Sequence, residues 1–388
     1  MRTAHSLVAS AALVCLVACS AAEGASEGHS SASASGATTM SGPTASPVGT
    51  SPSAAATGAT PSGAQLPVLQ GYRLARSVRA PGDGPLVYTD GTLWAVDRKD
   101  AGFDAQGRMN GDLWLVDPAT ARISGHVPHA RGGFPTAGLG ALWLVNAEYG
   151  ETVTRVGLRN HRVVSFRTSR TQDPVPEAVV VAAGSVWVGN NHDGDAVKVD
   201  PRNLDVVTRV HISSGGVRGH ATTDGRYVWM PSGDGHFVAR IDTRSDRVVS
   251  TFVVPVVDHP TRPATNPDEL SQPEWLEIVD GRLWVATWDH VYVVDISRVG
   301  AERIVADVRA DGVATSLGVG RDAVWAATGE PSALIRIDRA RFEVTGAMPL
   351  DSGPMMFGSA STAVPVGRAV WIRVKGRLLE LVPTGSAA

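Results

Sequence analysis

DGRYVW, at residues 224–229, is one copy of a short motif that repeats along the whole chain. In each copy a turn that contains Gly or Asp is followed by an apolar residue and then by Trp. The repeated tryptophans, 41 to 55 residues apart, are Trp94, Trp143, Trp187, Trp229, Trp284, Trp325 and Trp371. A repeat of this length, built from short β-rich units, predicts a β-propeller.

Each repeat is expected to contain four strands. Apolar and polar residues alternate in AVKVD (196–200) and LIRID (334–338), which is the pattern of a strand. Strand A precedes the motif, as in Ala178–Ala183, and strand B carries the Trp. Strand D follows strand C after a short turn, as in Asp205–Ile212. We expect the Trp to fill the space between neighbouring sheets. Strand C often ends in an Asp suited to an Asx-turn, and these residues are Asp117, Asp200, Asp242, Asp295 and Asp338.

The seventh repeat stops at Leu381-Val382-Pro383 and lacks a strand D. The segment Tyr72–Arg79 precedes the first repeat and has the character of a strand D without a sheet of its own. Pairing it with Arg377–Leu381 would complete the seventh blade and remove the open edges of the ring. The sequence therefore predicts an all-β, seven-bladed propeller of four-stranded blades, closed by the N-terminal strand.

The N-terminus has the features of an export signal. Arg2 is followed by an apolar stretch, Ser6–Ala18, which is too short to span a membrane. The stretch ends in Leu16-Val17-Ala18-Cys19, which resembles a bacterial lipobox. That resemblance implies that residues 1–18 are removed, that Cys19 carries the lipid, and that the protein is anchored on the outer side of the cell membrane.

A low-complexity segment follows Cys19. Of the 47 residues from 20 to 66, 40 are Ser, Ala, Gly, Thr or Pro, and none is aromatic. Such a composition does not bury enough apolar surface to offset the entropy lost on ordering. We therefore expect three parts: a signal peptide at 1–18, a lipidated and disordered tether at 19–66, and the propeller at 67–388.

Charge and loop lengths limit the partners. The formal net charge is −3, so the chain lacks the basic field that nucleic-acid binding needs. We expect a monomer whose ligand is a small molecule, a glycan or a protein. Long loops bind partners more often than tight turns do. The insertions, all assigned to the face where D–A and B–C loops meet, are Lys99–Asn110, Ser169–Pro176, Pro255–Pro273 and Asp351–Gly358.

Candidate site residues come from two sets of positions around the central channel. The first residues of strand A are expected to crowd its mouth, and these include Glu177, His220, Glu274 and Trp275, with Arg218 just outside. Polar residues also recur three positions after the repeated Trp: Asp97, Asn146, Asn190, Ser232, Thr287 and Thr328. This second set either completes hydrogen bonding around the channel or forms a polar ring that receives a small ligand.

The repeat resembles the YVTN/NHL-like propellers, including the virginiamycin B lyase-like superfamily. The resemblance rests on the apolar-Trp pairs and on turns such as VDPAT (116–120) and VDPRN (199–203). GHATTDGRYVW (219–229) resembles the His-bearing strand of that family. The resemblance implies His220 as a base that works with a Glu and a divalent metal ion. One blade later Trp275, beside Glu274, stands where the family has a second His. A binding module is therefore expected, with a lyase-like or hydrolytic enzyme as the alternative.

Two other kinds of site fit the sequence less well. Asn191–Asp195 has oxygen-bearing side chains at alternate positions, but it lacks the distal Glu of a calcium loop, so a hairpin turn is favoured. Glu177, Asn146 and Asn190 are residue types used by lactonases on six-bladed propellers, although the blade count differs. Neither a Ser nucleophile elbow nor a phosphate-binding loop occurs.

Overall fold

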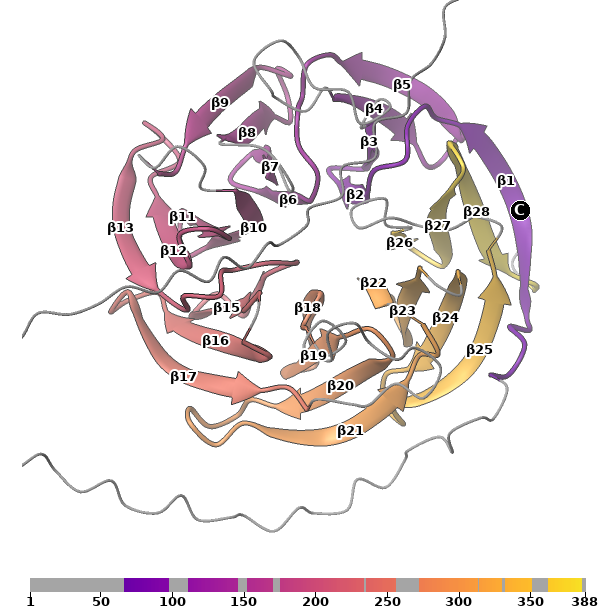
Figure 1. Cartoon of the computed structure of the whole chain (residues 1–388). Coiled ribbons are helices and arrows are strands. Elements are labelled where there is room, and N and C mark those ends of the chain that lie inside the picture. Colours follow the sequence, from indigo (N-terminus) through magenta and orange to yellow (C-terminus); the bar gives the residue numbers. More distant parts are fainter. Residues whose placement is uncertain are drawn as a thin grey trace, which may run out of the picture. The chain divides into compact units, whose positions relative to one another are not determined.

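The computed structural model of the chain describes residues 66–97, 111–145, 152–169, 175–233, 235–255, 272–312, 314–329, 332–350 and 362–385. These residues form seven four-stranded antiparallel sheets arranged in a ring (Figure 1). None of the described segments is a helix long and apolar enough to cross a membrane. The seven-bladed, all-β propeller predicted from the Trp repeat is confirmed.

The blades follow the order of the chain, and strands A to D of each are given from the channel outward. Blade one has β2 (Leu86–Thr89), β3 (Thr92–Asp97), β4 (Asp112–Asp117) and β5 (Arg122–Val127). Blade two has β6 (Pro135–Gly138), β7 (Ala141–Val145), β8 (Thr152–Gly157) and β9 (Val163–Arg167). Blade three has β10 (Pro176–Ala182), β11 (Ser185–Asn190), β12 (Asp195–Val199) and β13 (Val206–His211). Blade four has β14 (Thr222–Thr223), β15 (Tyr227–Pro231), β16 (Phe237–Asp242) and β17 (Arg247–Val253).

Blade five has β18 (Trp275–Val279), β19 (Arg282–Ala286), β20 (His290–Asp295) and β21 (Arg303–Arg309). Blade six has β22 (Ala314–Val319), β23 (Ala323–Thr328), β24 (Ala333–Asp338) and β25 (Glu343–Pro349). Blade seven has β26 (Ala363–Val366), β27 (Ala369–Val374), β28 (Arg377–Pro383) and β1 (Tyr72–Arg79). Expected strand ends shift by one or two residues. Ala183 lies in a turn at positive φ instead of ending a strand, because the A–B turn of blade three requires that conformation.

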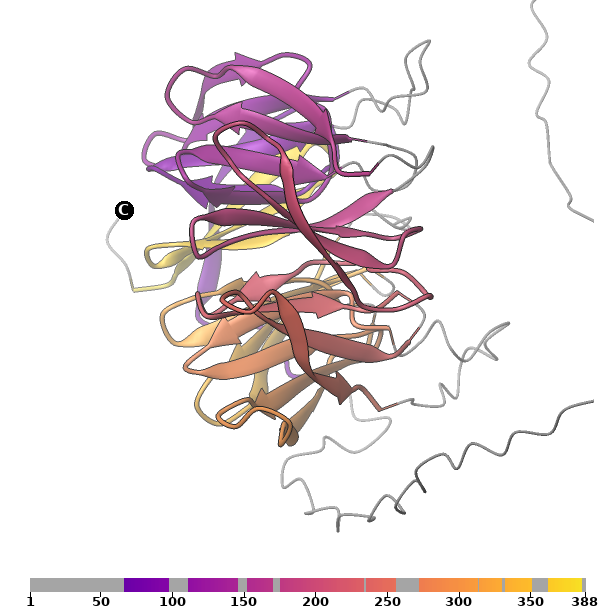
Figure 2. The same cartoon turned by 90° about the vertical axis from the view of Figure 1, so that its left-hand side faces the viewer.

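The first strands of the blades surround the central axis of the ring, and the fourth strands run along the rim (Figure 1). In an antiparallel sheet of this order, strand A begins, strand B ends, strand C begins and strand D ends on the same side. We call this side the mouth face; Figure 2 shows the ring edge-on. Most of the four long insertions expected on this face falls outside the described residues, so their role stays a prediction.

The repeated tryptophans fill the space between blades, as predicted. Six of them are among the largest fully buried side chains, and Trp94 is 2% exposed. Trp229 of blade four, for example, packs in one cluster with Leu276 and Leu283 of blade five. Burying an aromatic side chain of this size stabilises a fold by about 3–5 kcal/mol relative to Ala. The motif therefore encodes the contact that joins each sheet to its neighbour.

A cation lies opposite the Trp in four blades. Arg155, Lys198, Arg240 and Arg336 are the strand C partners of Trp143, Trp187, Trp229 and Trp325. The Arg240 guanidinium lies 4.7 Å from the Trp229 ring, and its Nη1 donates to Glu302 Oε1 at 3.0 Å. Both partners of this ion pair are at most 4% exposed. A buried pair of this kind binds blade four to the residue that directly precedes β21 of blade five.

The N-terminal strand closes the ring. β1 pairs with β28 from Tyr72 opposite Pro383 to Arg79 opposite Arg377, as predicted. Before β1, the Leu69 amide donates to the Ala347 carbonyl of blade six at 2.8 Å, and Tyr72 packs edge-on against Trp325. This short segment therefore touches blade six as well as completing blade seven.

Arg373 joins the other side of the closure. Its side chain, 2% exposed on β27, donates to carbonyl oxygens of blade one and of the segment that enters it. The acceptors are the carbonyls of Ala80, Pro81, Gly84 and Val96. A buried guanidinium needs several acceptors of this kind, so the seam between blades seven and one is polar as well as apolar.

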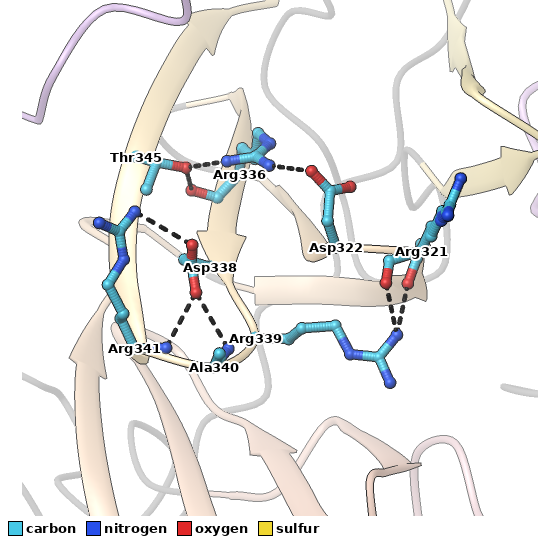
Figure 3. Close-up of polar contacts among 9 residues, drawn as sticks. Arg321, Asp322, Arg336, Asp338, Arg339, Ala340, Arg341 and Thr345 are labelled. Carbon is cyan, nitrogen blue, oxygen red and sulfur yellow. Dashed lines mark hydrogen bonds and ion pairs between the residues drawn. The ribbon is translucent and has the colours of Figure 1, made fainter.

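The Asp residues at the ends of strand C form the expected turns. Asp338 Oδ1 accepts the Ala340 and Arg341 amides at 3.0 and 2.9 Å (Figure 3). The four other Asp residues likewise accept the amide two positions on. In the same close-up Arg339 donates to the carbonyls of Gly320 and Arg321, which lie in the A–B turn of blade six. These hydrogen-bonded turns form the face of the ring opposite the mouth face.

Candidate functional site at the channel mouth

Glu177 enters the site through an irregularity in its strand. The register between β10 and β11 shifts between Pro176 and Ala178, so Glu177 is the extra residue of a β-bulge. Bulges turn a side chain away from the regular alternation of a strand. The Glu177 side chain accepts a hydrogen bond from Asn191 Nδ2 at 3.1 Å, and its Oε2 lies 3.7 Å from Arg218 Nε. Blade three thus contributes a carboxylate to the mouth.

The chain before β14 leaves its own blade and pairs with the next one. His220 forms a parallel bridge with Trp275, in which its amide donates to the Glu274 carbonyl and its carbonyl accepts the Leu276 amide. Gly219 allows this approach, because a Cβ there would lie 2.6 Å from the Glu274 carbonyl oxygen and its φ is +90°. The backbone therefore fixes His220 against blade five.

The His220 ring is held on both its face and its edge. It stacks on the Trp275 indole at 4.0 Å between centroids, with 3° between the ring planes. Its Nδ1 lies 3.2 Å from the Leu276 carbonyl oxygen, which accepts only, so Nδ1 is the protonated nitrogen. Burial lowers the pKa of His220 to about 4. At neutral pH the ring is uncharged, and Nε2 keeps its lone pair.

An aromatic contact crosses the channel. Phe134, which precedes the first strand of blade two, meets Trp275 of blade five edge-on with 6.2 Å between ring centroids. Blades two and five lie on opposite sides of the ring (Figure 1). Phe134 also packs against the apolar clusters on both sides. Phe134, His220 and Trp275 therefore form a floor of aromatic rings at this end of the channel, which we call the aromatic floor.

Charged groups from three successive blades meet close in the chain to His220 and Trp275 of the aromatic floor. Arg218 lies between Glu177 of blade three and Glu274 of blade five, and its charge lowers the pKa of Glu274. Burial outweighs this effect, so the pKa of Glu274 is raised overall. Burial also raises the pKa of Glu277 to about 7, although the Trp275 indole N–H donates to its Oε1 at 3.2 Å. Raised carboxyl pKa values of this kind are common at functional sites.

The polar residues three positions after the Trp form hairpin ends. The five that the structure describes are at most 2% exposed. Thr287 and Thr328 donate to the His290 and Ala333 carbonyls, and Ser232 accepts the Gly235 amide. Asn190 accepts the Thr168 hydroxyl at 2.8 Å, while Asp97 accepts the Trp114 indole N–H at 3.1 Å. These bonds fit the first of the two interpretations, hydrogen bonding around the channel.

Some expected sites are not tested or take another form. Asn146 and Cys19 lie outside the described residues. Asn191–Asp195 is the B–C hairpin turn, closed by the Gly194 amide on the Asn190 carbonyl at 3.0 Å. In the described part of the chain, no group of three or more His, Cys, Asp and Glu side chains is placed to hold a metal ion. The divalent metal implied by the lyase resemblance thus finds no ligand set among these residues.

Sequence reasoning missed two residues of the mouth, Phe134 and Trp288, and the contact that Asn191 makes with Glu177. Phe134 belongs to no repeat position, so only the closed ring reveals that it reaches blade five. Trp288 lies outside the repeated motif, and its indole contributes to lowering the pKa of Glu274. Its position outside the repeat could have identified it, because a tryptophan that is not needed for packing between blades is a candidate for a functional site. Asn191, which holds Glu177, follows directly after a residue that was singled out.

Comparison with known proteins identifies the fold. No family model and no curated protein sequence matches the chain. Among solved structures, it resembles a selenomethionine-substituted virginiamycin B lyase from Staphylococcus aureus, with a TM-score of 0.61 and 12% identity over 80% of this chain and 99% of that one. It also resembles a streptogramin B lyase, with a TM-score of 0.61 and 13% identity over 81% and 98%. The chain has the propeller fold of these lyases. At such identities the likeness concerns the fold alone.

Proposed function

We propose that the protein is a lipid-anchored, extracytoplasmic binding module whose propeller takes up a ligand at the channel mouth. The observation that carries this proposal is the meeting of Glu177, Arg218 and Glu274, from three successive blades, next to the rings of the aromatic floor. Concave sites with a few convergent polar groups over apolar walls are typical of ligand binding. The ligand would be a small molecule, or a side group of a glycan or protein.

Rigid support favours a recognition role for this site. The backbone pairing of His220 with Trp275 and the bulge at Glu177 fix the two walls. The polar hairpin ends, such as Asn190 and Thr287, hold the surrounding turns. Groups held in place before binding lose little entropy when a ligand arrives. The mouth therefore suits selective uptake of one chemical class.

The anchor rests on the sequence of the N-terminus. The lipobox ending at Cys19 and the Ser/Ala/Gly/Thr/Pro-rich segment after it are typical of a tethered lipoprotein. Replacing Cys19 with Ala should release the protein to the medium or leave it unprocessed. Detergent partitioning measures this directly. A Cys19→Ala protein that still partitions with the membrane would show that the anchor lies elsewhere.

A lyase-like enzyme is the second candidate, favoured by His220. Its Nδ1 donates to the Leu276 carbonyl, so Nε2 is the unprotonated nitrogen and can accept a proton. Incubation with virginiamycin B, with and without Mg²⁺, followed by mass spectrometry, separates the two functions. Turnover that His220→Gln removes supports the enzyme. Absence of turnover, together with ligand capture that a bulky label at position 218 blocks, supports the binding module.

A further inference from the structure

One oxygen of the Glu274 carboxylate, Oε1, lacks a hydrogen-bond donor, although the Trp288 indole acts on the carboxylate as a donor and lowers its pKa. Glu274 directly precedes β18, the first strand of blade five, and its amide donates to the Ala286 carbonyl at 2.8 Å. Its Oε1 is buried and has no hydrogen-bond partner among the residues that the structure describes. A buried polar atom without a partner destabilises a fold by about 1–3 kcal/mol, and by more when it is charged. In a native protein such an atom calls for an explanation, and a ligand, an ion or a water that completes it is one.

The positive charge of Arg218 at the mouth is shared between two carboxylates. The Arg218 guanidinium acts on Glu274 and also faces Glu177, with 3.7 Å between Nε and Oε2. His220 adds no positive charge at neutral pH, because burial keeps it uncharged. Among the described residues of the mouth, one guanidinium thus stands against two carboxylates. The two carboxylates are therefore short of positive charge and Glu274 Oε1 is short of a donor, whereas Arg218 already faces a carboxylate on each side.

The surroundings strengthen this imbalance. Trp275 and Trp288 lie beside Glu274, and Phe134 meets Trp275 edge-on. Aromatic walls exclude water, so charge interactions at Glu274 are stronger than in bulk solvent. The faces of aromatic rings also attract cations. Both effects favour a ligand that carries positive charge together with an apolar body.

We propose that the channel mouth recognises a small organic cation, a protonated amine whose N–H groups pair with Glu274. This inference rests on the binding function proposed above and names its ligand class. An anionic ligand would have to displace Glu177 or Glu274 from Arg218. A divalent ion would need three suitable side chains, which the described residues do not bring together, and would be repelled by the guanidinium. An amine satisfies Oε1 and balances the second carboxylate.

The test uses three probes of equal length that differ in charge: n-butylammonium, n-butanol and n-butyrate. The full chain, labelled with ¹⁵N in tryptophan, is titrated in detergent at pH 7.5 while the indole N–H signals of Trp275 and Trp288 are followed. Trp275→Phe and Trp288→Phe assign those signals. We expect n-butylammonium to bind at least tenfold more tightly than the other two probes.

Charge variants identify the recognising group. Glu274→Gln should remove the preference for n-butylammonium, whereas Arg218→Gln should strengthen it by freeing Glu274 from its competitor. Glu343→Gln, at an exposed position on β25, is the matched control and should change nothing. A folded Glu274→Gln protein is recognised by an unchanged pattern for the other indole signals.

The possible failures are distinct. Tighter binding of n-butyrate, or a preference that persists in Glu274→Gln, overturns the cation class while leaving a binding mouth in place. If no probe shifts either indole signal, the cation class is also overturned, and the binding function is then judged separately by blocking the mouth with a covalent label.

Discussion

Arg76 and Glu380 lie 304 positions apart in the chain and face each other across the outer strands of blade seven. Arg76 Nη2 donates to Glu380 Oε1 at 2.6 Å, and Nε donates to the other carboxylate oxygen. The same guanidinium donates to the carbonyls of Pro118 and Ala119 in blade one, at 2.8 and 2.6 Å. One side chain therefore joins the two ends of the propeller to its first blade.

Deleting Gly71–Arg79 should destroy the cooperative unfolding of the propeller. The deletion removes β1, which leaves β28 as an open edge and takes Arg76 away from Glu380. Exposed edge strands promote aggregation. Circular dichroism during heating, together with light scattering, measures both effects. A deletion protein that melts like the parent would contradict the closure described here.

Glu302→Ala should be far more costly than the equivalent change in blade six. It leaves Arg240 buried and unpaired, which costs about 3–5 kcal/mol of unfolding free energy. Arg336 occupies the same strand position, but its partner Asp322 is 70% exposed, so Asp322→Ala should cost at most about 1 kcal/mol. Urea unfolding of both variants checks the difference. Similar losses would show that the Arg240–Glu302 pair is not what joins blades four and five.

Gly219→Ala and Gly225→Ala form a matched pair. Both glycines have φ near +90°, so each substitution strains the backbone by about 1–2 kcal/mol. A Cβ at Gly225 meets nothing within 4 Å, whereas one at Gly219 would lie 2.6 Å from the Glu274 carbonyl oxygen. Gly219→Ala should therefore lower the melting temperature further and weaken ligand binding. Equal melting temperatures and unchanged binding would argue against the close approach of blades four and five at His220.

Glu277→Gln should change how stability depends on pH. Burial raises the pKa of Glu277 to about 7, above its ordinary value of 4.5, so the folded protein keeps a proton that the unfolded chain releases. Stability contributed by this group therefore falls as pH rises from 4.5 to 7. Relative to the parent, Glu277→Gln should gain on the order of 1–3 kcal/mol by pH 8 and close to nothing at pH 4.5. Chemical unfolding across this range checks it; a difference that does not vary with pH would contradict the raised pKa.

The fold was predictable because each repeat carries its own inter-blade contact. Trp229 and its equivalents mark strand B at regular intervals, and the missing strand D of the seventh repeat identified Tyr72–Arg79 as the closing strand. Local patterns of this kind depend on residues close in sequence. The exact strand ends were not predictable from these patterns, because turns such as that at Ala183 require a positive φ that the alternation of apolar and polar residues does not reveal.

The site was only partly predictable, since its geometry depends on contacts between blades. Counting from the Trp placed Glu177, His220, Glu274 and Trp275 near the channel mouth. The bulge that turns Glu177 toward Arg218, and the pairing of His220 with blade five, break the regular repeat. Phe134 reaches Trp275 only because the ring brings opposite blades together. Such contacts have no signature within a single repeat.

Blocking the channel mouth with a covalent label tests the central claim most directly. The two cysteines of the chain, Cys15 and Cys19, precede the propeller, so a cysteine introduced by Arg218→Cys offers a defined attachment point for a bulky maleimide. Arg247→Cys, at an exposed position on β17 of the same blade, is the matched control. Both variants of the full chain, labelled and unlabelled, are dialysed in detergent against the low-molecular-weight fraction of a bacterial culture supernatant, and retained compounds are identified by mass spectrometry. The account predicts that some compounds are retained by both unlabelled proteins and by labelled Arg247→Cys, but are lost by labelled Arg218→Cys. Equal retention of these compounds by the two labelled proteins would contradict it.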